Sequence, residues 1–115
     1  MDSVLTSIKK LLGVDEDYEH FDVDIMMHIN SVLMRLNQLG VGPTKGYHIS
    51  SKAETWSDFI GDRDDLEAVK TYVYDRVRLI FDPPSAGYLV EAIKERSKEF
   101  EWCINVQVEG GPDYD

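Results

Sequence analysis

This chain of 115 residues is poor in three features that would each define a class of protein: cysteine, positive charge and long apolar runs. Cys103 is the only cysteine, so an intrachain disulfide is impossible and a cysteine-based zinc site lacks its ligands. We expect its thiol to be buried and inert. No apolar run approaches the roughly 20 residues that span a bilayer, so we expect a soluble protein without a membrane partner.

Positive charge is scarce. Twelve lysines and arginines stand against 22 aspartates and glutamates, which gives a net charge of -10. Neutralising nucleic-acid phosphates requires clustered lysine and arginine, so this balance argues against direct binding to DNA or RNA. The beginning of the chain, MDSVLTSIKKLLG, also lacks the continuous apolar segment of a secretory signal, and we expect a cytosolic location.

Motifs for metal binding are missing as well. The three histidines, at positions 20, 28 and 48, do not share a helical spacing that suits a metal site. Asp15, Asp17 and Glu19 superficially resemble a calcium loop. However, His20 occupies the position that requires glycine, and Met26 occupies that of the closing glutamate. We therefore expect no bound metal.

Catalytic motifs are also absent. The sequence has no glycine-rich phosphate loop and no nucleophile elbow. The pairs Asp64/Asp65 and Glu99/Glu101 could supply an acid and a base, but their positions at a helix start and on a helix's polar face favour solvated surface. The sequence therefore predicts a protein that is not an enzyme and has no cofactor.

Helical periodicity dominates what the chain does have. It predicts an all-α bundle of four to five helices, with a long loop after the second helix. The expected helices cover residues 3–12, 23–39, 55–60, 64–81 and about 85–104. Their expected buried faces contain Val4, Ile8, Leu11 and Leu12; Ile25, Ile29, Val32, Leu33 and Leu36; Trp56, Phe59 and Ile60; Leu66, Val69, Val73, Val77 and Ile80; and Leu89, Ile93, Phe100 and either Cys103 or Ile104.

The fourth and fifth helices meet at a proline pair. Pro83 disfavours the α conformation at Asp82, and neither Pro83 nor Pro84 has the N–H that a helical hydrogen bond needs. The chain must turn here, so Asp82, Pro83 and Pro84 are predicted to form a structural junction.

Two regions are candidate contact surfaces. Residues 41–54 form a loop longer than is usual inside a compact domain, with a possible short strand over Tyr47, His48 and Ile49. Tryptophans are usually core residues but are enriched where proteins meet, and Trp102 lies next to the chain's C-terminal segment. We therefore expect contacts with a subunit or partner at Trp102, Tyr47, His48 and Ile49.

The helical pattern changes after Ile104. Val106 and Val108 alternate with polar residues, and the sequence GGPDYD follows. This change divides the chain into a helical domain, residues 1–104, and a mobile C-terminal tail, residues 105–115, which could pair as a strand with a partner.

Taken in order, the segments IKKLLG, HINSVLMRLNQLGVGP and RLIFDPP resemble those of the head-tail connector, or head-completion, proteins of tailed bacteriophages. The resemblance covers nearly the whole chain. It implies a structural subunit in the neck of the virion, assembled in the host cytoplasm. Such subunits form a homo-oligomeric ring, with twelve copies expected, on the portal protein. The ring extends the DNA channel, through which DNA passes without specific binding, and offers a surface to a neck or tail-completion protein.

The resemblance also assigns the portal contact to the C-terminal segment, at positions matching Asn105, Val106, Gln107, Val108 and Glu109. Two other functions remain open. The chain could be an acidic DNA mimic that binds a nucleic-acid enzyme through residues 15–24 and 58–67, or a small regulatory protein that binds one partner.

Overall fold

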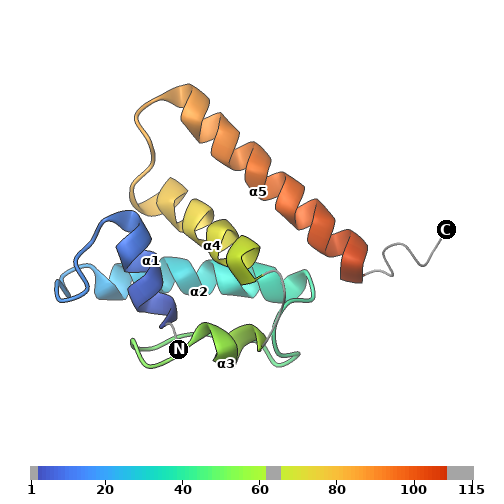
Figure 1. The fold of residues 1–115 in the computed structure, drawn as a ribbon, viewed down its shortest axis with the longest axis horizontal. Coiled ribbons are helices and arrows are strands. Elements are labelled where there is room, and N and C mark those ends of the chain that lie inside the picture. Colours follow the sequence, from blue (N-terminus) through green and yellow to red (C-terminus); the bar gives the residue numbers. More distant parts are fainter. Residues whose placement is uncertain (1–2, 62–65, 109–115) are drawn as a thin grey trace.

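The computed structural model describes residues 3–61 and 66–108, and this part of the chain contains five α-helices and no strand. They are α1 (Val4–Leu12), α2 (Asp22–Gln38), α3 (Trp56–Ile60), α4 (Leu66–Phe81) and α5 (Gly87–Val108). Helix α4 lies at the centre and contacts α1, α2 and α5. Figure 1 shows α5 on one side of α4, with α3 and the long loop on the other. The predicted all-α class is confirmed.

Local chemistry sets the ends of α1 and α3. Ser3 caps α1 by accepting a hydrogen bond from the Thr6 N–H, and Gly13 adopts a left-handed conformation after its last turn. Thr55 and Asp58 form a capping box at the start of α3. The Val4 N–H donates to the Glu54 carbonyl, and the Trp56 indole donates to Ser7 at 2.7 Å. These bonds attach α3 to the beginning of α1.

The core is formed by α1, α2, α3 and α4 together with the buried loop residues Val41 and Ile49. The predicted stripe of α2 is buried at all five positions. Helix α5 adds Ile104, while Phe100 packs at the edge of the core and stacks on Tyr72 with ring centroids 4.8 Å apart. The core therefore belongs mainly to residues 4–81, and α5 packs against its side.

Three predicted core positions are wrong, because Leu11, Ile80 and Leu89 are all exposed. Leu11 is exposed because the buried face of α1 is centred on Leu5, Ile8 and Lys9. Ile80 is exposed because the buried face of α4 continues from Val77 to Phe81, whose ring lies 5.4 Å from that of Phe21 between centroids.

The helix boundaries also differ from those expected in α5. This helix begins at Gly87, two residues after Ser85, and continues to Val108. The helix therefore extends four residues past its expected end at Ile104, and no helix breaker occurs before Gly110. Residues 109–115 of the expected tail, like the start of the fourth predicted helix at residues 64–65, lie outside the described residues.

At the proline pair the chain leaves one helix and enters the next. Helix α4 ends at Phe81, and residues 82–86 form a non-helical connection that reverses the chain into α5. The Asp82 N–H completes the last helical bond to the Arg78 carbonyl at 2.9 Å, after which Pro83 and Pro84 offer no donor.

Candidate docking surfaces

A groove lies between α2 and the loop that follows it, with a volume of about 880 Å³. One wall is α2, which contributes Val23, Met27 and Met34. The other wall is the loop, which contributes Lys45, Tyr47 and His48. Val23, Met27 and Met34 are largely exposed although they are apolar. We call this surface the α2–loop groove. Exposed methionines are common where proteins bind partners, because the side chain adapts its shape.

Two asparagines of α2 hold the loop in place. The Asn30 side chain accepts from the Ile49 N–H at 2.7 Å and donates to the Ile49 carbonyl at 2.9 Å. Asn37 donates to the Pro43 carbonyl at 2.5 Å. Because Asn30 occupies both backbone groups of Ile49, this segment does not form the predicted strand. The loop is instead a fixed wall.

Close packing against α3 fixes the other side of the loop. Tyr47 lies 5.3 Å from Phe59 between ring centroids, and burial, with the nearby carboxylates of Asp58 and Glu54, raises the pKa of Tyr47. Gly42 has a φ of +91°, and a Cβ atom there would lie 2.5 Å from the Phe59 ring. Only glycine fits this approach.

Glu54 closes the loop before α3. Its carboxylate accepts hydrogen bonds from the backbone N–H and hydroxyl groups of Ser50 and Ser51. Partial burial opposes ionisation of Glu54, but its own backbone N–H and the bonds from the two serines outweigh burial and lower its pKa.

The second surface is α5, which polar bonds fasten to the body. Arg96 donates two hydrogen bonds of 2.7 Å to the buried carboxylate of Asp75. Five residues farther along the helix, Glu101 accepts from the Tyr72 hydroxyl at 2.5 Å and from Arg35 at 3.0 Å. We call these three residues the Glu101 cluster; they join α2, α4 and α5.

Protonation in the Glu101 cluster follows its geometry. Burial alone would raise the pKa of Glu101, but the bonds from Tyr72 and Arg35 and the positive charges of Arg35 and Arg76 outweigh burial and lower it. Burial and the facing carboxylate raise the pKa of Tyr72 far above its ordinary value. The phenol therefore stays protonated and the carboxylate ionised near neutral pH, which suits the bond between them.

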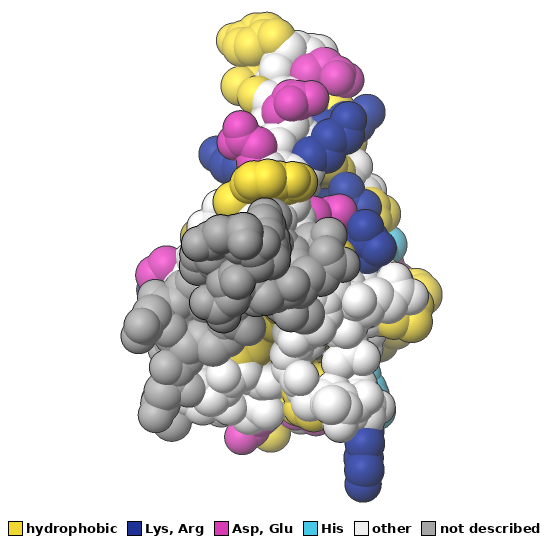
Figure 2. Space-filling model, turned by 90° about the vertical axis from the view of Figure 1, so that its right-hand side faces the viewer, with side chains coloured by type: hydrophobic (Ala, Val, Ile, Leu, Met, Phe, Trp, Pro, Cys, Tyr) yellow, Lys and Arg dark blue, Asp and Glu magenta, His cyan; other side chains and the backbone are white. Residues whose placement is uncertain are grey.

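The side of α5 that faces away from the body is exposed along its length. Tyr88 is 76% exposed and Trp102 is 67% exposed, although both are large aromatic residues. In Figure 2, α5 rises above the body with hydrophobic side chains at its upper end and again farther down, and charged side chains lie between them.

A family comparison identifies the class of protein that carries these surfaces. The family model described as phage connector protein matches residues 4–111, which include every described helix. The chain belongs to the phage connector protein family. No curated protein and no solved structure matches it in the other two comparisons. The predicted resemblance is confirmed at the level of the family, and the chain has a phage connector role and is associated with the virion.

In this phage connector protein, the predicted contact residues fall into three environments. Trp102 is exposed on α5, and His48 is exposed in the α2–loop groove. Tyr47 is partly buried in the same groove, whereas Ile49 is a core residue whose side chain is not available to a partner. Asn105, Val106, Gln107 and Val108 are in the last turn of α5, and Glu109 lies outside the described residues.

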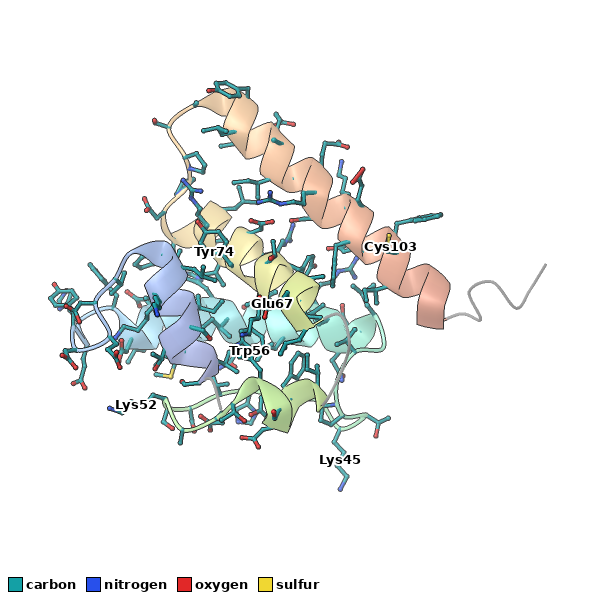
Figure 3. All side chains as sticks on the ribbon, in the orientation of Figure 1. Lys45, Lys52, Trp56, Glu67, Tyr74 and Cys103 are labelled. Atoms are coloured by element: carbon teal, nitrogen blue, oxygen red, sulfur yellow. The ribbon has the colours of Figure 1, made fainter. Side chains whose placement is uncertain are left out.

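Two other predictions for this connector protein are wrong. Cys103 is exposed, and Figure 3 shows it on the C-terminal half of α5. The helix turns its neighbour Ile104 into the core instead. Glu101 is not solvated surface, because Tyr72 and Arg35 bond to it.

Sequence reasoning also missed a buried lysine. Lys9 is 2% exposed, and its ammonium group lies 2.7 Å from the Asp22 carboxylate in an ion pair. It also donates to the carbonyls of Glu16 and Tyr18 at 3.0 and 2.8 Å. Lys9 thereby holds the acidic connection between α1 and α2. The only available signal was its position on the apolar face of α1, next to Leu5 and Ile8.

The connector protein's described residues, 3–61 and 66–108, contain neither a metal-binding group nor a membrane span. No group of three or more His, Cys, Asp or Glu side chains there could hold a metal ion. None of the helices there has the length and hydropathy of a membrane span.

Proposed function

We propose that this chain is a structural, non-catalytic connector subunit that assembles as a ring of twelve on the portal protein. The ring extends the channel through which DNA passes, and it offers an attachment surface to a neck or tail-completion protein. The observation that carries the proposal is the family match over residues 4–111, which leaves no described helix unmatched.

The surfaces of the subunit support this role. A ring subunit needs contacts on several sides, and this chain exposes apolar residues on two separate elements, α2 and α5. The net charge of -10 suits a wall past which DNA moves without binding.

The portal contact is proposed for the C-terminal end of α5 and the segment after it, residues 105–109. The helix continues to Val108, so most of this contact has a preformed backbone. Ordering a residue on binding costs about 1–2 kcal/mol of backbone entropy, and a helical segment avoids much of that cost.

The composition of purified virions tests the proposal. Quantitative mass spectrometry should find this chain at a fixed ratio to the portal protein, and capsids made without it should lose packaged DNA or fail to join tails. A DNA mimic or a regulatory protein would instead remain in the infected-cell lysate. Virions that lack the chain would refute the connector proposal.

A further inference from the structure

We infer that the outward side of α5 in one subunit docks into the α2–loop groove of a second copy of this chain. This inference rests on the proposed ring and names the contact between its subunits. Three features of the described surfaces support it: spacing, charge and position.

The first supporting feature is the spacing of exposed residues along α5. Tyr88, Ala92, Glu95, Glu99 and Trp102 follow one another at intervals of four, three, four and three residues, so they form a single stripe, which we call the outer face of α5. All five are exposed. Fourteen residues of helix separate the two aromatic rings by roughly 21 Å.

The groove has a matching apolar row. Val23, Met27 and Met34 lie along α2 over eleven residues, which is roughly 16 Å of helix. A helix that lies in a groove is a common mode of recognition, with apolar anchors at helical spacing. Methionines can adapt to the large rings of Tyr88 and Trp102.

Charge favours the same pairing. Glu95 and Glu99 form no ion pair with any described residue. In a protein of net charge -10, the groove contains no carboxylate among its lining residues, but it contains Lys45 and His48. Lys45 extends from the loop into solvent, as Figure 3 shows. The groove is therefore a place on this acidic surface where the carboxylates of the outer face meet no like charge.

Position explains why the contact would build a ring. The outer face and the groove are on different elements, and Figure 1 shows α5 and the loop on opposite sides of α4. Two different surfaces that bind each other make a head-to-tail contact. Such a contact closes into a ring when the rotation between neighbours allows it, and otherwise gives an open filament.

Cross-linking in virions tests the inference, and the native Cys103 supplies one of the two thiols. Cys103 is exposed beside Trp102, and Lys45→Cys places the second thiol in the groove. After treatment with a short bismaleimide, virions carrying Lys45→Cys should yield linked dimers, trimers and longer products. Ser31→Cys, also in the groove, provides a second position if the first variant is not incorporated. Lys10→Cys, which replaces an exposed lysine of α1 outside the groove, is the matched control and should yield no ladder.

The outcomes separate this inference from the proposed function. Virions that contain both groove variants but show no ladder beyond the control would overturn the α5–groove contact while the connector role stands. Virions that lack the chain altogether would overturn both.

A charge exchange gives an independent check: Lys45→Glu should reduce the yield of tailed particles at least tenfold, and Lys45→Glu with Glu99→Lys should restore it. Failure of the double variant to restore the yield would count against the contact.

Discussion

The body of the subunit, residues 4–81, and α5 are held together by different forces. The body has a continuous apolar core from four helices and a loop. Helix α5 buries Ile93 and Ile104 and fastens itself with directional bonds at Asp75 and at the Glu101 cluster. Apolar burial tolerates small shifts, whereas charged hydrogen bonds require a defined geometry. We therefore expect the apolar core of the body to determine whether the chain folds. The directional bonds hold α5 against the body in one orientation, in which it presents a binding face.

The largest expected effect comes from weakening the core. Leu33→Ala, at a fully buried position of α2, should destabilise the protein by about 2–5 kcal/mol, because it removes apolar contacts and leaves a cavity. Met34→Ala changes the adjacent exposed residue and should alter stability by less than about 0.5 kcal/mol. Urea unfolding of both variants measures this difference. Equal losses of unfolding free energy in the two variants would mean that the buried position contributes no more to stability than the exposed one.

The Glu101 cluster should give the next largest effect. Glu101→Gln removes the charge that Tyr72 and Arg35 bind and should cost about 1.5–3 kcal/mol. Because folding lowers the pKa of Glu101, its stabilisation is present above the unfolded value near 4.5 and is lost as pH falls through the folded pKa. Across an acid pH series, the melting temperature should therefore depend less on pH in Glu101→Gln than in the wild type. The same dependence of melting temperature on pH in both proteins would show that the cluster does not stabilise α5.

A smaller effect is expected at Arg96, which is half exposed while its partner is buried. Arg96→Ala leaves the Asp75 carboxylate buried without its cation, which should cost about 1–3 kcal/mol. Lys98→Ala, an exposed change two residues along α5, is the control and should cost less than about 0.5 kcal/mol. Hydrogen exchange should show α5 opening sooner in Arg96→Ala, with the body unchanged. Faster exchange in both α5 and the body would instead show that the two unfold as one cooperative unit.

The smallest effect on stability is expected from shortening the chain. Deletion of residues 109–115 and deletion of residues 105–115 should both leave the melting temperature within about 2 °C of the wild type, since both keep Ile104 and every other described core residue. The longer deletion also removes the last turn of α5 and should abolish portal binding. Full complementation of a connector-deficient phage by the longer deletion would move the portal contact to the helical body.

The helices and the apolar faces of the body were largely predictable, because periodic burial in an amphipathic helix is visible in the order of residues. The buried α2 stripe is confirmed for this reason, and α4 ends at Phe81, just before the proline pair. Periodicity did not distinguish Cys103 from Ile104, which lie only 100° apart on α5. It also could not predict the Asn30–Ile49 bonds, since these join residues 19 positions apart through a side chain and a backbone.

The candidate surfaces were predictable only in part. The loop and Trp102 were identified from length and composition, but the groove depends on how α2 and the loop pack together. The exposed row of Val23, Met27 and Met34 follows the same helical period as a buried face. The predicted buried stripe of α2 already leaves these three residues outside it, but nothing in the sequence indicates that the loop lies beside them to form a groove.

Reconstitution with the portal tests the central claim most directly. The purified chain, mixed with purified portal rings of the same phage, should bind as a ring of defined copy number that native mass spectrometry can count. Without portal, the chain should remain a monomer or weak oligomer at low salt, because subunits of net charge -10 repel one another. Failure to bind the portal, or a ring that stays closed without it at low protein concentration and low salt, would contradict the account.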